Sequence, residues 1–122
     1  DLVERFTVKT PMLETPAGNL SGGNIQKLIL ARELSSEPGV LLASQPTRGV
    51  DIGAAEYIHR RLIEERLRGA AVLVISEDLD EVLALSDRIA VMSEGRILAV
   101  MDRSEATIQR IGLLMAGSEA VA

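Results

Sequence analysis

Leu20–Lys27, reading Leu-Ser-Gly-Gly-Asn-Ile-Gln-Lys, is the stretch that decides how the rest of the chain is interpreted. The serine and two glycines precede apolar residues at helical spacing, which predicts a helix that begins here and ends near Ser36, where Glu37-Pro38-Gly39 stops it. The first amide hydrogens of a helix lack partners within it, and the helix dipole makes this end positive, so such a start can bind an anion. Ser21 can cap the helix or donate its hydroxyl to a phosphate oxygen. A plain capped turn without a ligand is the alternative, and these residues alone do not decide between the two.

Composition limits the classes of protein that fit. The chain has 122 residues, of which 47% are hydrophobic but only two are aromatic (one Phe and one Tyr), so we expect one domain with an aliphatic core. The net charge of -5 argues against a nucleic-acid-binding surface, and the lack of cysteine excludes disulfides and thiolate metal sites. No apolar run approaches the roughly 20 residues that cross a bilayer, so we expect a soluble, cytoplasmic protein.

Two short apolar runs predict parallel strands that are buried on both faces, Val40–Ala43 and Ala71–Ile75. Between them, the spacing of apolar residues predicts a helix over about Ala54–Arg68, which Gly69 ends. Strand, helix and strand in this order form a βαβ unit of an α/β fold.

The remaining segments predict smaller elements. Alternation over Phe6–Lys9 indicates a short strand, and Asp78 is placed to cap a short helix, Leu79–Leu85. Ile89–Met92 and Ile97–Val100 flank a turn at Gly95, as in a hairpin. We expect Ser104 to cap a last helix, whose apolar face is formed by Ile108, Ile111, Leu114 and Met115 and which Gly117 ends.

Polar residues follow each of the two buried strands. Ser44-Gln45-Pro46-Thr47-Arg48-Gly49-Val50-Asp51 comes after the first, and Ser76-Glu77-Asp78 comes after the second. Open α/β sheets bind ligands beyond the carboxyl ends of their strands, so both segments are candidate site residues. An ordinary exit from a strand into a loop is the alternative for each.

Taken together and in this order, the segments resemble the ATP-binding domain of ABC transporters. Leu20–Lys27 matches the family's signature motif, Val40–Gln45 the end of the Walker B strand, Arg48–Asp51 the D-loop, and Ser76–Val82 the switch-loop region. The resemblance implies a P-loop NTPase core of α/β class, with a mainly parallel sheet flanked by helices, a terminal hairpin and a truncated N-terminus. Residues 1–36 would be the remainder of the helical subdomain, and residues 37–122 the C-terminal part of the core.

Finer details resemble one branch, the importers of simple sugars and nucleosides, whose ATPase subunit carries two such domains. Asn24 stands where most of the family has Gln, and Gln45–Gly49 and Ile111–Gly117 look like parts of the second domain. The implied partners are the first ATP-binding domain of the same parent chain, the transmembrane permease subunits and, indirectly, an extracytoplasmic solute-binding protein. The implied location is the inner face of the cell membrane.

The resemblance also assigns roles to single residues. Leu20, Ser21, Gly22, Gly23, Asn24 and Asp51 would contact ATP held by the partner domain. At the catalytic positions this chain departs from the family. Ser44 and Gln45 replace the Asp and Glu of the Walker B end, and Glu77 replaces the usual switch His. These substitutions indicate a degenerate half, with ATP and Mg²⁺ bound only in the complete composite site.

A phosphate-binding loop is missing from the sequence. Gly18–Gly23 has the glycine spacing of such a loop, but it continues with Asn24 and Ile25 in place of the required Lys and Ser or Thr. The chain opens without Met, so we expect a fragment whose exposed sheet edges favour oligomerisation. The loop should lie upstream, and the fragment alone should be inactive.

Two other functions remain open. One is a non-catalytic docking or regulatory α/β module that kept the ABC core, and a remoter one is an ABC-type ATPase outside transport. The other titratable residues suggest no site: His59 has no second metal ligand at matching spacing, and Asp80 and Glu81 are expected on the outer face of a short helix.

Overall fold

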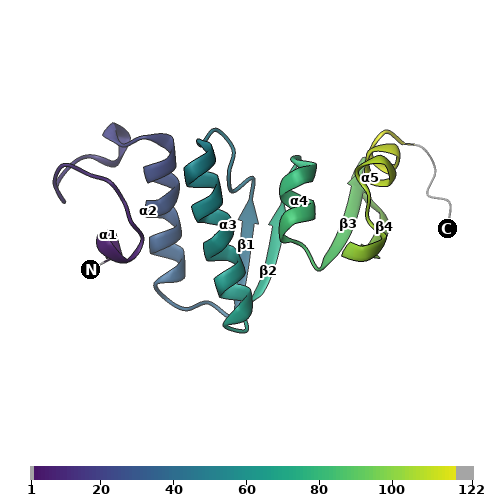
Figure 1. The fold of residues 1–122 in the computed structure, drawn as a ribbon, viewed down its shortest axis with the longest axis horizontal. Helices are drawn as coiled ribbons and strands as arrows, with labels where there is room; N and C mark the ends of the chain where they lie inside the picture. Colours follow the sequence, from purple (N-terminus) through teal and green to yellow (C-terminus); the bar gives the residue numbers. More distant parts are fainter. Residues whose placement is uncertain (1, 118–122) are drawn as a thin grey trace. The chain divides into compact units, whose positions relative to one another are not determined.

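The fold was analysed in a computed structural model, which describes residues 2–117 (Figure 1). The chain divides into two compact units, Asp1–Ile75 and Ser76–Ala122, each of which is described by itself. The first unit contains α1 (Leu2–Arg5), η1 (Ala17–Asn19), α2 (Gly22–Leu34), β1 (Val40–Ser44), α3 (Ile52–Leu67) and β2 (Ala71–Ile75). The second contains α4 (Leu79–Leu85), β3 (Arg88–Ser93), β4 (Arg96–Asp102), η2 (Arg103–Glu105) and α5 (Ile108–Met115).

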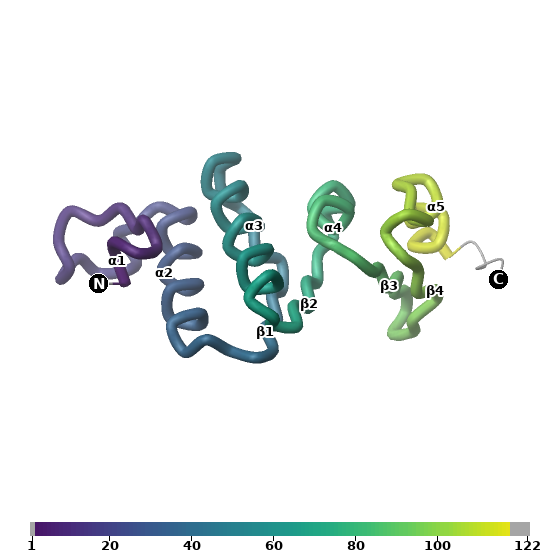
Figure 2. Tube along the Cα trace, turned by 60° about the horizontal axis from the view of Figure 1, so that its bottom comes forward, coloured from purple at the N-terminus to yellow at the C-terminus, as the bar shows by residue number. Residues whose placement is uncertain are grey.

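The predicted βαβ unit is present in the first unit. Strands β1 and β2 are parallel, paired from Val40 with Ala71 to Ser44 with Ile75. Helix α3 connects them, and α2 lies beside α3 in both views of the chain (Figures 1 and 2). The helices differ from the predicted ranges by one or two residues at their ends, because the caps Ser21 and Asp51 and the turns after the helices set the limits.

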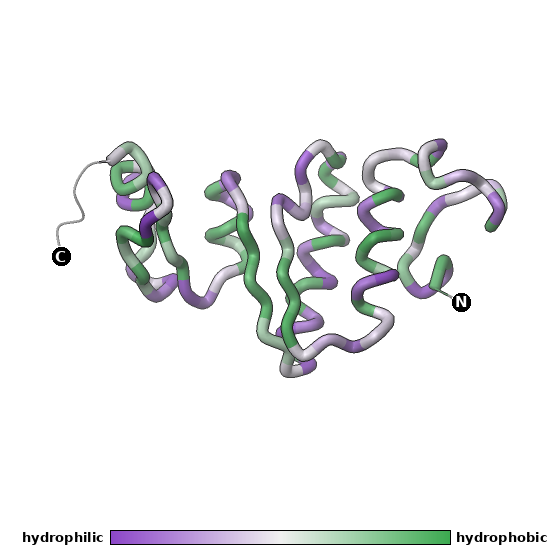
Figure 3. The backbone as a smooth tube through the Cα atoms, turned by 180° about the vertical axis from the view of Figure 1, so that it is seen from behind, coloured by the Kyte–Doolittle hydropathy of each residue, from purple (hydrophilic) through white to green (hydrophobic). Residues whose placement is uncertain are grey.

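The prediction that both strands are buried on both faces is wrong for the described residues. Val40 and Leu42 are 69% and 68% exposed, and Leu73 and Ile75 are 55% and 52% exposed. The strands are strongly apolar along their length (Figure 3). In the part of the chain that is described, the sheet has two strands, and alternate side chains point away from the core that includes Leu41, Ile58 and Leu62.

The predicted strand at Phe6–Lys9 is also wrong. Leu2–Arg5 forms a short helix, and Thr7 adopts a left-handed conformation with φ 52°, which a strand does not allow. The alternating pattern instead reflects burial of every second residue, since Phe6 is fully buried and Val8 nearly so while Thr7 is exposed. The Phe6 ring lies under the Arg61 guanidinium, whose carbon is 4.3 Å from the ring centroid, and this contact fixes the segment to α3.

The second unit is a hairpin covered by helices. β3 and β4 pair antiparallel around Gly95, whose φ is 75°, as the sequence predicts. Helix α5 packs on β3, and the core is formed by Ile89, Val91, Met101, Ala106, Ile111 and Leu114. Ser104 does not cap this helix, because it lies within η2; Thr107 caps it instead, accepting a hydrogen bond from the Arg110 amide.

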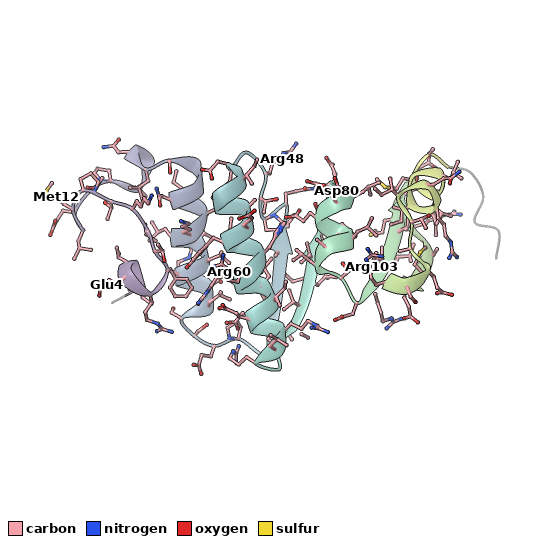
Figure 4. All side chains as sticks on the ribbon, viewed as in Figure 1. Glu4, Met12, Arg48, Arg60, Asp80 and Arg103 are labelled. Carbon is pink, nitrogen blue, oxygen red and sulfur yellow. The ribbon has the colours of Figure 1, made fainter. Side chains whose placement is uncertain are left out.

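Helix α4 begins at its predicted cap, Asp78, but Glu81 does not lie on an outer face. Asp80 is exposed (Figure 4), whereas Glu81 is only 3% exposed and accepts a 2.5 Å hydrogen bond from the Ser76 hydroxyl. The adjacent carboxylates therefore differ in environment, because neighbouring positions on a helix point in different directions. Among residues 2–117, no helix combines the length and the apolar character needed to span a bilayer.

Candidate functional site

The start of α2 presents unpaired backbone donors. Ser21 is the N-cap, with extended φ and ψ of -62° and 157°, and its Oγ accepts a 3.2 Å hydrogen bond from the Asn24 amide. The Ile25 amide donates to the Ser21 carbonyl at 2.9 Å. The first four amides of a helix have no partner one turn earlier, and of the amides within this first turn those of Gly22 and Gly23 have no acceptor among the described residues, whereas that of Asn24 donates to Ser21 Oγ. Ser21 and Gly22 are exposed and Gly23 is buried, and anion binding by this helix start stays a prediction.

Asn24 joins this helix start to the N-terminal segment. Its Nδ2 donates to Ser21 Oγ at 2.8 Å, and its Oδ1 accepts from the Lys9 amide at 2.8 Å. Lys27, one turn further along, donates from Nζ to the Thr7 carbonyl at 3.4 Å, and this Nζ lies 4.7 Å from the centroid of the Tyr57 ring. The segment before α2 is thus attached to the first two turns of that helix.

The start of α2 packs directly against the start of α3. A Cβ atom on Gly23 would lie only 2.7 Å from the Ala54 Cβ, so no larger residue fits at position 23 without a shift. Asp51 caps α3 by accepting a 2.8 Å hydrogen bond from the Ala54 amide, and its other oxygen faces Gly23. The structure therefore brings the predicted signature residues together with Asp51 of the predicted D-loop.

The residues after β1 lie close to α2 through a different contact. The Gln26 side chain donates from Nε2 to the Pro46 carbonyl at 3.1 Å. Gln45 extends the strand pairing, with its amide donating to the Ile75 carbonyl at 2.7 Å, but it has a left-handed φ of 48°. Such a conformation is unfavourable for a residue other than glycine, and it is more so before a proline.

The end of β1 offers no carboxylate for a cation. Ser44 and Gln45 occupy this place, and within residues 2–117 no group of three or more His, Cys, Asp and Glu side chains is arranged to hold a metal ion. Ser44 and Gln45 therefore do not fit Mg²⁺, which prefers charged oxygen ligands.

The other predicted site residues lie at the margins. Leu20 is half-buried and ends η1, and Glu77 is exposed and follows Ser76 in the second unit. The described residues 2–21 contain the short helix α1, turns and η1 but no strand, so the glycine spacing of Gly18–Gly23 lacks the strand that a phosphate-binding loop follows.

Three contributors to this site were not identified from the sequence. The Lys9 amide gives no sequence signal, because every residue other than proline has one. Gln26 could have been identified as a site residue because it lies three residues after Gly23 and therefore on the same face of α2. Ala54 could have been found from the small residues Gly53-Ala54-Ala55 at the start of α3, which allow a close approach.

Comparison with known proteins identifies similar chains. No protein-family model matches the sequence. It is 53% identical over 117 residues to the guanosine import ATP-binding protein NupO of Bacillus subtilis and 51% identical to the nucleoside import ATP-binding protein NupA of Lactococcus lactis. Over 109 residues it is 52% identical to the ribose import ATP-binding protein RbsA of Rhodopirellula baltica. The first two matches cover 96% of this chain but only 23% of each relative, so the chain spans less than a quarter of their length.

Solved structures give the same answer for the fold. A nucleotide-free ATP-binding cassette from an ABC transporter superposes with a TM-score of 0.72 at 31% identity, over 83% of this chain and 40% of the cassette. The ADP conformation of another ABC transporter cassette gives a TM-score of 0.70 at 27% identity, over 94% of this chain and 43% of that one. The fold is that of a P-loop NTPase of the ABC ATP-binding cassette type, and the chain matches part of such a cassette.

Proposed function

We propose that the chain is the C-terminal part of the second ATP-binding domain of a simple-sugar or nucleoside importer, and that it supplies the signature motif to a composite ATP site. The observation that carries this proposal is the start of α2, where Ser21 and Gly22 are exposed and the buried Gly23 lies beside Asp51. The similar chains are import ATP-binding proteins for guanosine, nucleosides and ribose, which supports the transport class.

The proposed role of α2 is to bind phosphate oxygens. The Ser21 hydroxyl and the amides of Gly22 and Gly23 donate to the γ-phosphate of an ATP molecule bound by the partner domain. The positive end of the helix dipole adds to this attraction, and such donors stabilise charge that develops on a transferring phosphoryl group. Leu20, Asn24 and Asp51 hold this surface in place around the nucleotide.

The chain's own catalytic positions are proposed to be degenerate. Gln45 can orient a water molecule, but its neutral amide cannot accept the proton, and loss of a general base costs about 10² to 10⁴ in rate. Glu77 can offer the γ-phosphate no positive charge. With Ser44 in place of an aspartate, Mg²⁺ is held by groups outside this chain. Residues 1–36 belong to the helical subdomain and residues 37–122 to the core of the ATPase.

The proposed partners are those of an importer's ATP-binding subunit. The proposed partners are the first ATP-binding domain of the same polypeptide and transmembrane permease subunits, with a solute-binding protein acting through the permease. The chain then lies on the cytoplasmic face of the membrane. The 122-residue chain alone is expected to oligomerise through exposed strands and to lack ATPase activity.

The test is Ser21→Arg in the full-length subunit assembled with its permease. We expect loss of ATP turnover, because a large cation at this position blocks the approach of the nucleotide. Gln45→Ala in the same assembly should have a much smaller effect. Unchanged turnover in Ser21→Arg contradicts the proposal, and an equally large loss in Gln45→Ala would show that this half hydrolyses ATP itself.

A docking module is the second candidate, favoured by the substitutions at Ser44 and Gln45. Calorimetric titration of MgATP into the chain, alone and with the partner domain, separates the two. Binding that requires the partner supports the composite site. A complex with the partner that forms equally well without nucleotide supports the docking module.

A further inference from the structure

We propose that Asn24 is a positioning residue, which forces the Ser21 hydroxyl to act only as a hydrogen-bond donor and so adapts the site to phosphate oxygens. This inference rests on the proposed function, since it concerns the same helix start. Asn24 does not need to touch the nucleotide, because it acts through Ser21.

The first step is the orientation of the Asn24 side-chain amide. A backbone N–H can only donate, so the atom that faces the Lys9 amide at 2.8 Å is the Asn24 oxygen. The NH₂ group is therefore the part that faces Ser21 Oγ, also at 2.8 Å. Reversing the side chain would bring two donors together at Lys9.

The second step is the state of the Ser21 hydroxyl. A serine oxygen has two acceptor sites and one proton. The Asn24 backbone amide occupies one acceptor site at 3.2 Å, and the Asn24 side chain occupies the other at 2.8 Å. The proton must then point away from Asn24, and because Ser21 is exposed, it is available to a ligand.

The third step separates this role from ordinary helix capping. The cap needs only the bond from the Asn24 backbone to Ser21, which any residue at position 24 other than proline can make. The side-chain bond adds nothing to the cap, but it fixes the direction of the hydroxyl. With the amide of the exposed Gly22, the hydroxyl forms a pair of neighbouring donors that suits an anionic oxygen.

The network also places the N-terminal segment in the site. The Lys9 amide that orients Asn24 follows Phe6 and Val8, both buried in the first unit. The direction of the Ser21 proton is therefore set by a segment that lies outside the signature stretch. The hydrogen bond from the Lys9 amide to Asn24 Oδ1 is the contact through which this segment orients the Asn24 side chain.

The decisive variant is Asn24→Asp in the full-length subunit assembled with its permease, titrated with MgATP. The new carboxylate has the same shape and still accepts from Lys9, but it also accepts the Ser21 proton and so turns the hydroxyl away from the nucleotide. We expect the apparent affinity for MgATP to fall by about 10- to 100-fold, the worth of a hydrogen bond to a charged group.

Two measurements distinguish a reoriented Ser21 hydroxyl from damage to the fold and from a general effect of the added negative charge. Because a carboxylate is favourable near a helix N-terminus, the thermal unfolding midpoint should be unchanged or raised while affinity falls. Asn19→Asp is the matched control, since it adds the same charge to an exposed neighbouring turn. Its effect should be small and disappear at high salt, whereas that of Asn24→Asp should persist.

Asn24→Ala gives an intermediate case, in which the hydroxyl keeps the cap but rotates freely, and we expect a loss of a few-fold. The inference is overturned if Asn24→Asp binds MgATP as tightly as the unsubstituted protein, or if high salt abolishes its loss of affinity as in Asn19→Asp. Either result leaves the proposed role of the signature residues intact. If Ser21→Arg keeps full turnover, the proposed function itself fails.

Discussion

The start of α2 and the end of β1 lie in the same unit and are joined by the hydrogen bond between Gln26 and Pro46. They differ in the side chains that they present. At the start of α2, Ser21 and Asn24 form a closed hydrogen-bond network that directs donors outward. At the end of β1 stand Ser44 and a neutral Gln45, where the resemblance to ABC cassettes implies carboxylates, and Gln45 has a left-handed φ of 48°. Under the proposed function, binding of a phosphate and activation of a water are separable properties, and this chain keeps the residues for the first.

Among the substitutions that test the difference between the two regions, Gly23→Ala at the start of α2 should have the largest effect. The added methyl would meet the Ala54 side chain at 2.7 Å, so α2 and α3 must separate at the helix start. We expect destabilisation by about 1 to 3 kcal/mol, as for overpacking of a core. Urea unfolding measures this, with Gly18→Ala as the control because a Cβ there meets nothing within 4 Å. An equal effect of the two substitutions would mean that the close approach at Gly23 is not a constraint.

Gln26→Ala tests the connection between the two regions. It removes the hydrogen bond to the Pro46 carbonyl, and we expect a loss of about 0.5 to 1.5 kcal/mol in the free energy of unfolding. Gln109→Ala, an exposed glutamine in α5, is the control and should change stability by no more than about 0.5 kcal/mol. Hydrogen exchange at residues 45–50 should rise in Gln26→Ala alone. Unchanged exchange there would show that the loop is held without α2.

Gln45→Gly tests the backbone strain at the end of β1, and it should change the free energy of unfolding least of the three substitutions. The left-handed φ of 48° costs about 1 to 2 kcal/mol for a residue with a side chain, and the extra freedom of glycine when unfolded offsets about 0.5 to 1 kcal/mol of that. We expect a net gain of about 0.5 kcal/mol in urea unfolding. Glu37→Gly, at the same φ of 48° in an exposed turn, should give a similar gain. A loss in Gln45→Gly alone would reveal stabilising contacts of the Gln45 side chain.

Much of the fold could be predicted from local pattern. The helix that Ser21 caps, the βαβ order and the hairpin at Gly95 each rest on signals within a few residues, namely a cap, an apolar run or a glycine turn. Ser104 was predicted as the cap of α5 in place of the actual cap, Thr107, because both residues are suitable caps and the short helix η2 intervenes.

The errors arose where tertiary contacts decide. Phe6–Lys9 alternates like a strand, but no strand within the described residues pairs with it, and Phe6 packs under Arg61 instead. Glu81 is buried and accepts a hydrogen bond from Ser76, and helix periodicity alone does not reveal this partner. For the candidate site, the helix start at Ser21–Asn24 could be predicted from the sequence. The hydrogen bond from the Lys9 amide to Asn24 and the close approach of Ala54 to Gly23 could not.

The contact between Gly23 and Ala54 also limits how the sequence can vary. Because a methyl group at position 23 would overlap the methyl group of Ala54, the sizes of these two residues are coupled, although they belong to different helices. A library that randomises both positions should recover only pairs of small residues. Any homologue with a bulkier residue at one of them must therefore have moved one helix relative to the other, and its signature serine along with it.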